Sequence, residues 1–124
     1  MMTRILIVED EPLSRQVLQR RLSKAGYDVD SADNGRMALQ TLTAAATLPD
    51  VILTDLHMPE VNGYDLCASV RRNPRLAHLP IIIMSALDGA EYRESIQPFN
   101  VARYLTKPLA MDEVFAAIAD ALTS

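Results

Sequence analysis

The chain has 124 residues, of which 49% are hydrophobic and 23% are charged, and we expect residues 1–124 to form a single globular domain. The formal net charge of −4 argues against direct binding to nucleic acid or to anionic lipid. No apolar run is long enough to cross a bilayer and no signal-peptide pattern follows Met1, so we expect no membrane insertion and a cytoplasmic location.

Five short segments have the pattern of strands. Three of them are apolar and flanked by polar residues or proline, which is typical of strands buried on both faces. In the second of the five segments, apolar and polar residues alternate more weakly, and the fifth segment is centred on Tyr104 and Leu105. In chain order the expected strands are Ile5–Val8, Asp28–Ala32, Val51–Leu53, Ile81–Met84 and Ala102–Thr106.

An amphipathic segment follows each expected strand. Proline suits the first turn of the first helix, and Gly26 suits its end. The fourth segment has a poor apolar stripe, and Asp112 is an expected cap of the fifth. The expected helices are Pro12–Ala25, a stripe from Met37 to Ala45, a stripe from Leu66 to Val70, Asp88–Pro98 and Asp112–Leu122.

Strand–helix alternation repeated five times predicts an α/β fold with a parallel sheet and right-handed crossovers. We expect a five-stranded sheet in the order 2-1-3-4-5 with helices on both faces, a flavodoxin-like three-layer sandwich. In such a sheet the functional site lies beyond the carboxyl ends of the first and third strands. Cys67 lies on an apolar helical face and is expected in the core. Arg71, Arg72 and Arg75 are expected to form a solvated basic patch.

Acidic side chains stand at the predicted site. Glu9 and Asp10 follow the first strand, and Asp55 follows the third. At about 4 Å and an effective dielectric near 20, each like-charged pair costs roughly 4 kcal/mol, so a proton or a cation must offset the repulsion. Hard oxygen ligands favour Mg²⁺, with Mn²⁺ as an alternative. The expected ligands are Asp10, Asp55 and the backbone carbonyl of His57, with Glu9 acting through water.

Two further polar residues end the fourth and fifth strands, namely Ser85 and Lys107. A carboxylate beside a metal, an ammonium and a hydroxyl can attack phosphorus and form an aspartyl phosphate. Asp55 is the expected nucleophile because its strand is central in the sheet.

Four motifs stand in order at the strand ends or the turns after them. They are Val8-Glu9-Asp10-Glu11-Pro12, Thr54-Asp55-Leu56-His57-Met58-Pro59 with Gly63, Ser85-Ala86, and Tyr104-Leu105-Thr106-Lys107-Pro108. Together they resemble the receiver domain of two-component response regulators, and the resemblance covers essentially the whole chain.

The resemblance implies a role for each matching residue. Asp55 matches the phosphoacceptor, Glu9 and Asp10 the acidic pair that holds magnesium, and Lys107 the phosphate-contacting lysine. Ser85 matches the switch hydroxyl. The remaining matches are Tyr104 as the switch aromatic and Pro108 as a proline preceded by a cis peptide bond.

Two positions depart from the family pattern. Asn100-Val101 replaces a frequent Gly-Ala pair, and because asparagine tolerates left-handed backbone the turn can survive. His57, two residues after Asp55, stands at a variable position that influences how long the phosphoryl group lasts.

These observations predict a phosphorylation-activated signalling switch rather than an enzyme. The expected donor is a sensor histidine kinase or a histidine phosphotransfer protein, which would dock near Pro12–Ala25 and the loop after Lys107. Phosphorylation would change the face formed by Asp88–Pro98, Ala102–Thr106 and Asp112–Leu122, and thereby control a downstream protein or a fused output domain. We expect a monomer or a weak dimer.

Three alternatives remain open at the level of sequence. A Mg²⁺-dependent aspartyl-phosphate phosphatase would, by resemblance, carry a second Asp where this chain has His57. A flavin carrier of the same fold would need a phosphate loop after the first strand, where Glu9-Asp10-Glu11 is repulsive. A phosphate-independent binding module would not need Asp10, Asp55 and Lys107 together.

Overall fold

The computed structural model describes residues 2–56, 62–86 and 90–123. Its strands form one parallel sheet in the order β2-β1-β3-β4-β5, which confirms the predicted topology. The strands are β1 (Arg4–Val8), β2 (Asp28–Ala32), β3 (Val51–Asp55), β4 (Ile81–Ser85) and β5 (Arg103–Thr106).

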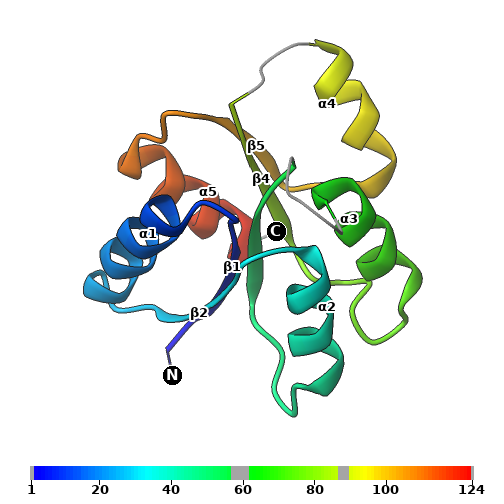
Figure 1. The fold of residues 1–124 in the computed structure, drawn as a ribbon, viewed down its shortest axis with the longest axis horizontal. Coiled ribbons are helices and arrows are strands. Elements are labelled where there is room, and N and C mark those ends of the chain that lie inside the picture. Colours follow the sequence, from blue (N-terminus) through cyan, green and yellow to red (C-terminus); the bar gives the residue numbers. More distant parts are fainter. Residues whose placement is uncertain (1, 57–61, 87–89, 124) are drawn as a thin grey trace.

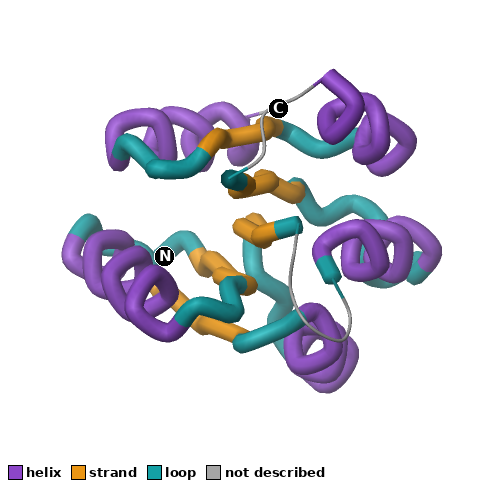
Figure 2. The backbone as a smooth tube through the Cα atoms, turned by 45° about the horizontal axis from the view of Figure 1, so that its top comes forward, coloured by secondary structure: helices purple, strands orange, loops and turns teal. Residues whose placement is uncertain are grey.

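Helices cover both faces of the sheet. They are α1 (Pro12–Lys24), α2 (Gly35–Ala44), α3 (Gly63–Arg72), α4 (Ala90–Ile96) and α5 (Met111–Thr123), with a 3₁₀ helix, η1 (Gln97–Phe99), after α4. In Figures 1 and 2, α1 and α5 pack on one face, and α2, α3 and α4 on the other. Within the described residues, no helix combines the length and apolar composition needed to cross a bilayer.

Alternation along the strands divides the core in two. On β1, Leu6 and Val8 face the α2–α3–α4 layer, while Ile5 and Ile7 face the α1–α5 layer. All four side chains are buried. Cys67 lies in the first of these layers, as expected for a core residue. The sheet is therefore fixed in register by apolar packing on both sides, which also fixes the ends of its strands.

Several element boundaries differ by one or two residues from the sequence expectation, and those next to the candidate site and after α4 matter most. β3 runs two residues beyond the expected Val51–Leu53 and β4 one residue beyond the expected Ile81–Met84, so that Asp55 and Ser85 are the last residues of their strands. The fourth helix ends at Ile96, and Gln97–Phe99 forms the 3₁₀ turn. Pro98 explains this change, because proline has no N–H to donate within a helix.

The backbone is left-handed at Asn100, where φ is 51°. This residue ends η1, and its N–H donates to the carbonyl of Gln97 at 3.1 Å. Asparagine thus supplies the turn conformation that glycine supplies more commonly.

Arg71 does not belong to a solvated patch, contrary to the sequence expectation. Its half-buried guanidinium donates to the carbonyls of Phe99 at 2.6 Å, Ala77 at 2.9 Å and Leu79 at 2.7 Å. Arg71 therefore joins the link between α3 and β4 to the end of η1. The hydropathy pattern marks Arg71 as polar and cannot show that backbone carbonyls surround it.

Candidate functional site

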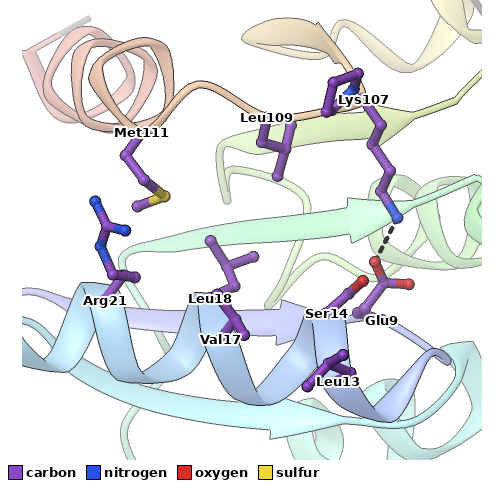
Figure 3. A pocket seen from close by; sticks show the side chains of 10 residues that line it. Glu9, Leu13, Ser14, Val17, Leu18, Arg21, Lys107, Leu109 and Met111 are labelled. Atoms are coloured by element: carbon purple, nitrogen blue, oxygen red, sulfur yellow. Dashed lines mark hydrogen bonds and ion pairs between the residues drawn. The ribbon is translucent and has the colours of Figure 1, made fainter.

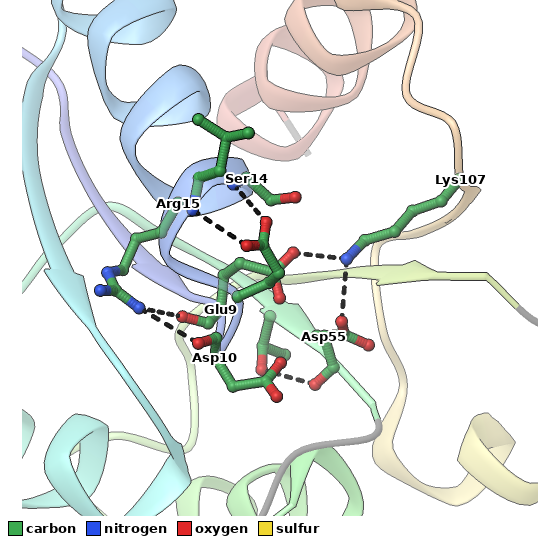
Figure 4. A network of polar contacts seen from close by, with 9 residues as sticks. Glu9, Asp10, Ser14, Arg15, Asp55 and Lys107 are labelled. Carbon is green, nitrogen blue, oxygen red and sulfur yellow. Dashed lines mark hydrogen bonds and ion pairs between the residues drawn. The ribbon is translucent and has the colours of Figure 1, made fainter.

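The strand order brings three carboxylates together. β1 and β3 are neighbours, with Val8 opposite Thr54, so Glu9 and Asp10 leave the sheet beside Asp55. Glu9, Asp10 and Asp55 each contribute one carboxylate oxygen to a group in which these atoms lie within 4.8 Å of one another. Figure 4 shows the cluster at the carboxyl edge of the sheet.

Glu9 is the most buried acid of the cluster and is only 2% exposed. Its Oε1 accepts a hydrogen bond from Lys107, whereas its Oε2 is buried with no hydrogen-bond partner among the described residues. Burial raises the pKa of Glu9, and the neighbouring Lys107 ammonium opposes that rise. A buried carboxylate oxygen without a donor is costly, and a cation at the cluster would satisfy it.

Lys107 joins two of the acids. Its Nζ donates to Glu9 and, at 2.9 Å, to Oδ2 of Asp55 (Figure 4). Burial lowers the pKa of Lys107, but the hydrogen bonds to Glu9 and Asp55 outweigh this effect, so its pKa is raised overall. The side chain is therefore a fixed ammonium that offsets part of the repulsion between the acids.

The position of Lys107 is set by the end of β5. Its backbone N–H donates to the carbonyl of Ser85 at 2.7 Å, and the Lys107–Pro108 peptide bond is cis, the isomer that the family resemblance implies. Ser85 ends β4 and is fully buried. The structure thus brings Ser85 and Lys107 to the edge that holds the three acids.

Tyr104 lies on β5 and is half-buried against the α2–α3–α4 layer. The guanidinium carbon of Arg93 lies 4.6 Å from the centroid of its ring, a distance typical of a cation–π contact. Arg93 was not singled out by the sequence pattern, since it belongs to the poorly amphipathic fourth helix.

Glu11 does not join the acidic cluster. Its carboxylate accepts from the backbone N–H groups of Leu13 at 3.2 Å and Ser14 at 2.7 Å, and so caps α1. These hydrogen bonds lower the pKa of Glu11. The backbone carbonyl of His57, a predicted metal ligand, lies outside the described residues.

Gly63 allows α3 to begin directly against the end of β3. Its N–H donates to the carbonyl of Leu56 at 2.9 Å. A Cβ at this position would stand 2.2 Å from the carbonyl oxygen of Asp55 and 2.7 Å from Cα of Leu56. The glycine of the sequence motif is therefore required by close backbone approach beside the candidate nucleophile.

The donor set suits a divalent metal ion. Three carboxylates supply hard oxygen atoms, and one of them, Glu9 Oε2, is buried without a donor among the described residues. With few protein ligands, such a site favours Mg²⁺ over softer ions because Mg²⁺ keeps several waters.

A cavity of about 410 Å³ opens beside Lys107 and Glu9, between α1 and the loop that leads to α5. Figure 3 shows Leu18, Leu109 and Met111 along it. At its rim, Leu13 is 66% exposed and Val17 is 49% exposed. The acidic site is thus bordered by an apolar surface.

Comparison with known proteins shows the family to which this chain belongs. The model of the response regulator receiver domain matches residues 5–119, and the chain belongs to this family. It is 37% identical over 119 residues to the "DNA-binding dual master transcriptional regulator RpaA" of Synechocystis sp., with 94% of this chain and 48% of RpaA covered. The chain thus spans about half the length of that relative.

Solved structures show the same fold. A putative response regulator from Chloroflexus aurantiacus superposes with a TM-score of 0.92 at 30% identity, with 100% of both chains covered. The response regulator TrrA from Thermotoga maritima, solved in complex with Mg²⁺-BeF, superposes with a TM-score of 0.84 at 29% identity, with 98% of this chain and 100% of TrrA covered.

Proposed function

We propose that this receiver domain is a signalling switch that accepts a phosphoryl group on Asp55. The observation that carries the proposal is the joint position of Glu9, Asp10 and Asp55 around an ammonium that contacts two of them. Asp55 ends the central strand and is 8% exposed, so its carboxylate lies in a site shielded from most solvent yet within reach of a donor.

The reaction moves one phosphoryl group. A carboxylate oxygen of Asp55 forms a bond to phosphorus while the bond from phosphorus to the donor nitrogen of a phosphohistidine breaks, and the released imidazole takes up a proton. Lys107, 2.9 Å from Asp55, is placed to stabilise charge on the transferred oxygens.

Mg²⁺ fits this site, with Asp10 and Asp55 as ligands, Glu9 acting through water, and the backbone carbonyl of His57 as a further ligand. The ion supplies positive charge that offsets the phosphoryl oxygens, and Mn²⁺ can supply the same charge. That TrrA was solved with Mg²⁺-BeF supports this assignment.

The switch is proposed to pass through Ser85 and Tyr104. The added phosphoryl group introduces negative charge and new acceptor oxygens beside Ser85, whose hydroxyl donates to one of them. Tyr104 then turns inward and leaves its contact with Arg93, so that the face of α4, β5 and α5 changes. The 4.6 Å contact between Arg93 and Tyr104 gives this change a measurable starting state.

The donor is proposed to be a sensor histidine kinase or a histidine phosphotransfer protein in the cytoplasm. The exposed Leu13 and Val17 beside the cavity offer it an apolar surface next to Lys107. The downstream partner is another protein or a fused output domain, with no direct contact between this domain and nucleic acid, and the domain acts as a monomer or a weak dimer. Its chemistry is limited to its own phosphorylation and dephosphorylation.

The test is intact-mass spectrometry after incubation with acetyl phosphate, with and without Mg²⁺. The expected product carries one added phosphoryl group, and its formation requires Mg²⁺. The matched control is Asp55→Asn, which keeps the shape of the side chain and removes the nucleophile. Equal modification of the wild type and Asp55→Asn would overturn the proposal, and absence of modification in both would favour a phosphate-independent binding module.

A further inference from the structure

One arginine holds the backbone of the acidic turn. Arg15 lies in α1, and its Nη1 donates to the carbonyl of Glu9 at 2.9 Å, with a longer contact of 3.5 Å to the carbonyl of Asp10 (Figure 4). Glu9 and Asp10 are consecutive residues that each supply a carboxylate to the cluster. Arg15 therefore bonds to the main chain that carries the site.

The guanidinium is itself held in place. The Arg15 side chain is 17% exposed and forms an ion pair with Asp33, the residue after β2, at 3.5 Å. On the other side of the turn, the N–H of Glu9 donates to the carbonyl of Ala32 at 3.1 Å. Both backbone polar groups of Glu9 are thus fixed, which leaves only side-chain rotation to move its buried carboxylate.

We propose that Arg15 is a positioning residue for the divalent-cation site. The carboxylates repel one another, so a turn that is free to rearrange would let Glu9 and Asp10 move away from Asp55. Bonds from Arg15 to the two carbonyls prevent this movement and keep the oxygens gathered before the ion arrives. The inference rests on the proposed function, because it concerns the ion that the proposed chemistry uses.

The direction in which cation affinity changes when Arg15 is removed separates a positioning role from simple electrostatics. Arg15 carries positive charge close to the acids, so its charge alone would weaken cation binding, and its removal would then tighten binding. A positioning role predicts the opposite result, namely that removal of Arg15 weakens binding although a repulsive charge has been lost.

The experiment is isothermal titration calorimetry with Mg²⁺ on the wild type, Arg15→Gln and Arg15→Lys. The matched control is Arg20→Gln, which makes the same change of charge at an exposed position of α1. We expect the Mg²⁺ dissociation constant to rise roughly tenfold in Arg15→Gln, the lower end of the range for residues that orient metal ligands. Arg15→Lys keeps the charge without the planar fork and recovers only part of the affinity.

Unfolding by urea without Mg²⁺ separates fold from site. If Arg15→Gln lowers the urea midpoint but its folded form binds Mg²⁺ as tightly as Arg20→Gln does, the residue is merely structural and the proposal is overturned. Tighter binding in Arg15→Gln overturns it as well. If the wild type itself fails to bind Mg²⁺, the proposed function falls too, which distinguishes the two failures.

Discussion

At the scale of single residues, the acidic site is a balance of charges in which Lys107 has the central place. Its ammonium contacts Glu9 and Asp55, which lie 98 and 52 positions away along the chain. Glu9 is almost completely buried, while the lysine side chain is 23% exposed. Removal of the lysine would leave two acids close together with less positive charge near them.

We predict that Lys107→Ala lowers the free energy of unfolding by about 2 kcal/mol without metal, below the usual cost of breaking a fully buried pair because the lysine is partly exposed. Addition of Mg²⁺ should restore part of this loss. Urea titrations monitored by circular dichroism measure both quantities, with Lys24→Ala on α1 as the control. A Lys107→Ala protein as stable as this control would show that the ammonium does not stabilise the acidic cluster.

The contribution of Lys107 to stability should also depend on pH. Because the pKa of Lys107 is raised, its contribution to the free energy of unfolding is complete below the ordinary lysine pKa of 10.5 and is lost as the pH rises through the raised value.

A second residue-scale prediction concerns the thiol of Cys67, which is fully buried. Burial raises its pKa to about 12 from the ordinary value of 9.0. The folded protein should therefore react slowly with iodoacetamide at pH 8 and quickly in urea.

The same shift should make stability depend on pH. Above pH 9 the thiol of Cys67 loses its proton in the unfolded chain and keeps it in the folded chain, so the free energy of unfolding falls as pH rises, by up to about 1.4 kcal/mol per pH unit. The Cys67→Ala variant should lose that part of the slope, and an unchanged slope would show that other groups cause it.

At the scale of elements, the site depends on how closely α3 meets the end of β3. The N-cap of α3 is Asn62, whose side chain accepts from the N–H of Asp65 at 3.0 Å. The first helical residue, Gly63, contacts the backbone of Asp55 and Leu56. A shift at the start of α3 would therefore also displace the backbone of Asp55, the candidate nucleophile.

Gly63→Ala should destabilise the protein by about 2 kcal/mol or more, although alanine favours helix formation, because its Cβ cannot stand 2.2 Å from the Asp55 carbonyl. The helix must shift, so the Mg²⁺ dissociation constant should also rise. Ser69→Ala in the same helix is the control, with an expected change within about 0.5 kcal/mol. A Gly63→Ala protein with unchanged stability and affinity would show that the backbone relaxes at no cost.

At the scale of the whole molecule, the strand order joins a local chemical event to a distant face. Asp55 on β3 pairs with Met84 on β4, and Ser85 pairs with Thr106 on β5. β5 in turn carries Tyr104, which touches Arg93 of α4. In the proposed switch, a change at Asp55 is therefore transmitted toward β5 and α4 and away from β2.

Hydrogen–deuterium exchange should detect this asymmetry. With beryllofluoride and Mg²⁺, we expect altered exchange in peptides from α4 to β5 and little change in α2, which packs over β1 and β2 rather than over β5. The control is Asp55→Asn, in which neither region should respond. Equal changes in α2 and in the α4–β5 segment would contradict a directed switch.

The sequence predicts the molecule best where one physical effect dominates. Apolar segments bounded by proline or glycine are sufficient to predict the fold class and the order of its elements. The ranges expected for the strands lie within two residues of those observed. The family motifs identify residues that meet at the strand ends. The roles of Arg15 and Arg71 are not predictable in this way, because each depends on backbone carbonyls placed by the fold. The orphaned oxygen of Glu9 likewise appears only once burial and partners are known.

Identification of the phosphorylated residue tests directly whether Asp55 is the phosphoacceptor. After phosphorylation with acetyl phosphate and Mg²⁺, borohydride reduction converts an acyl phosphate of aspartate to homoserine, which peptide mass spectrometry locates. We predict homoserine at position 55 and nowhere else in the chain. Homoserine at position 10, or an unmodified Asp55 in a protein that carries the phosphoryl group, would show that Asp55 is not the phosphoacceptor.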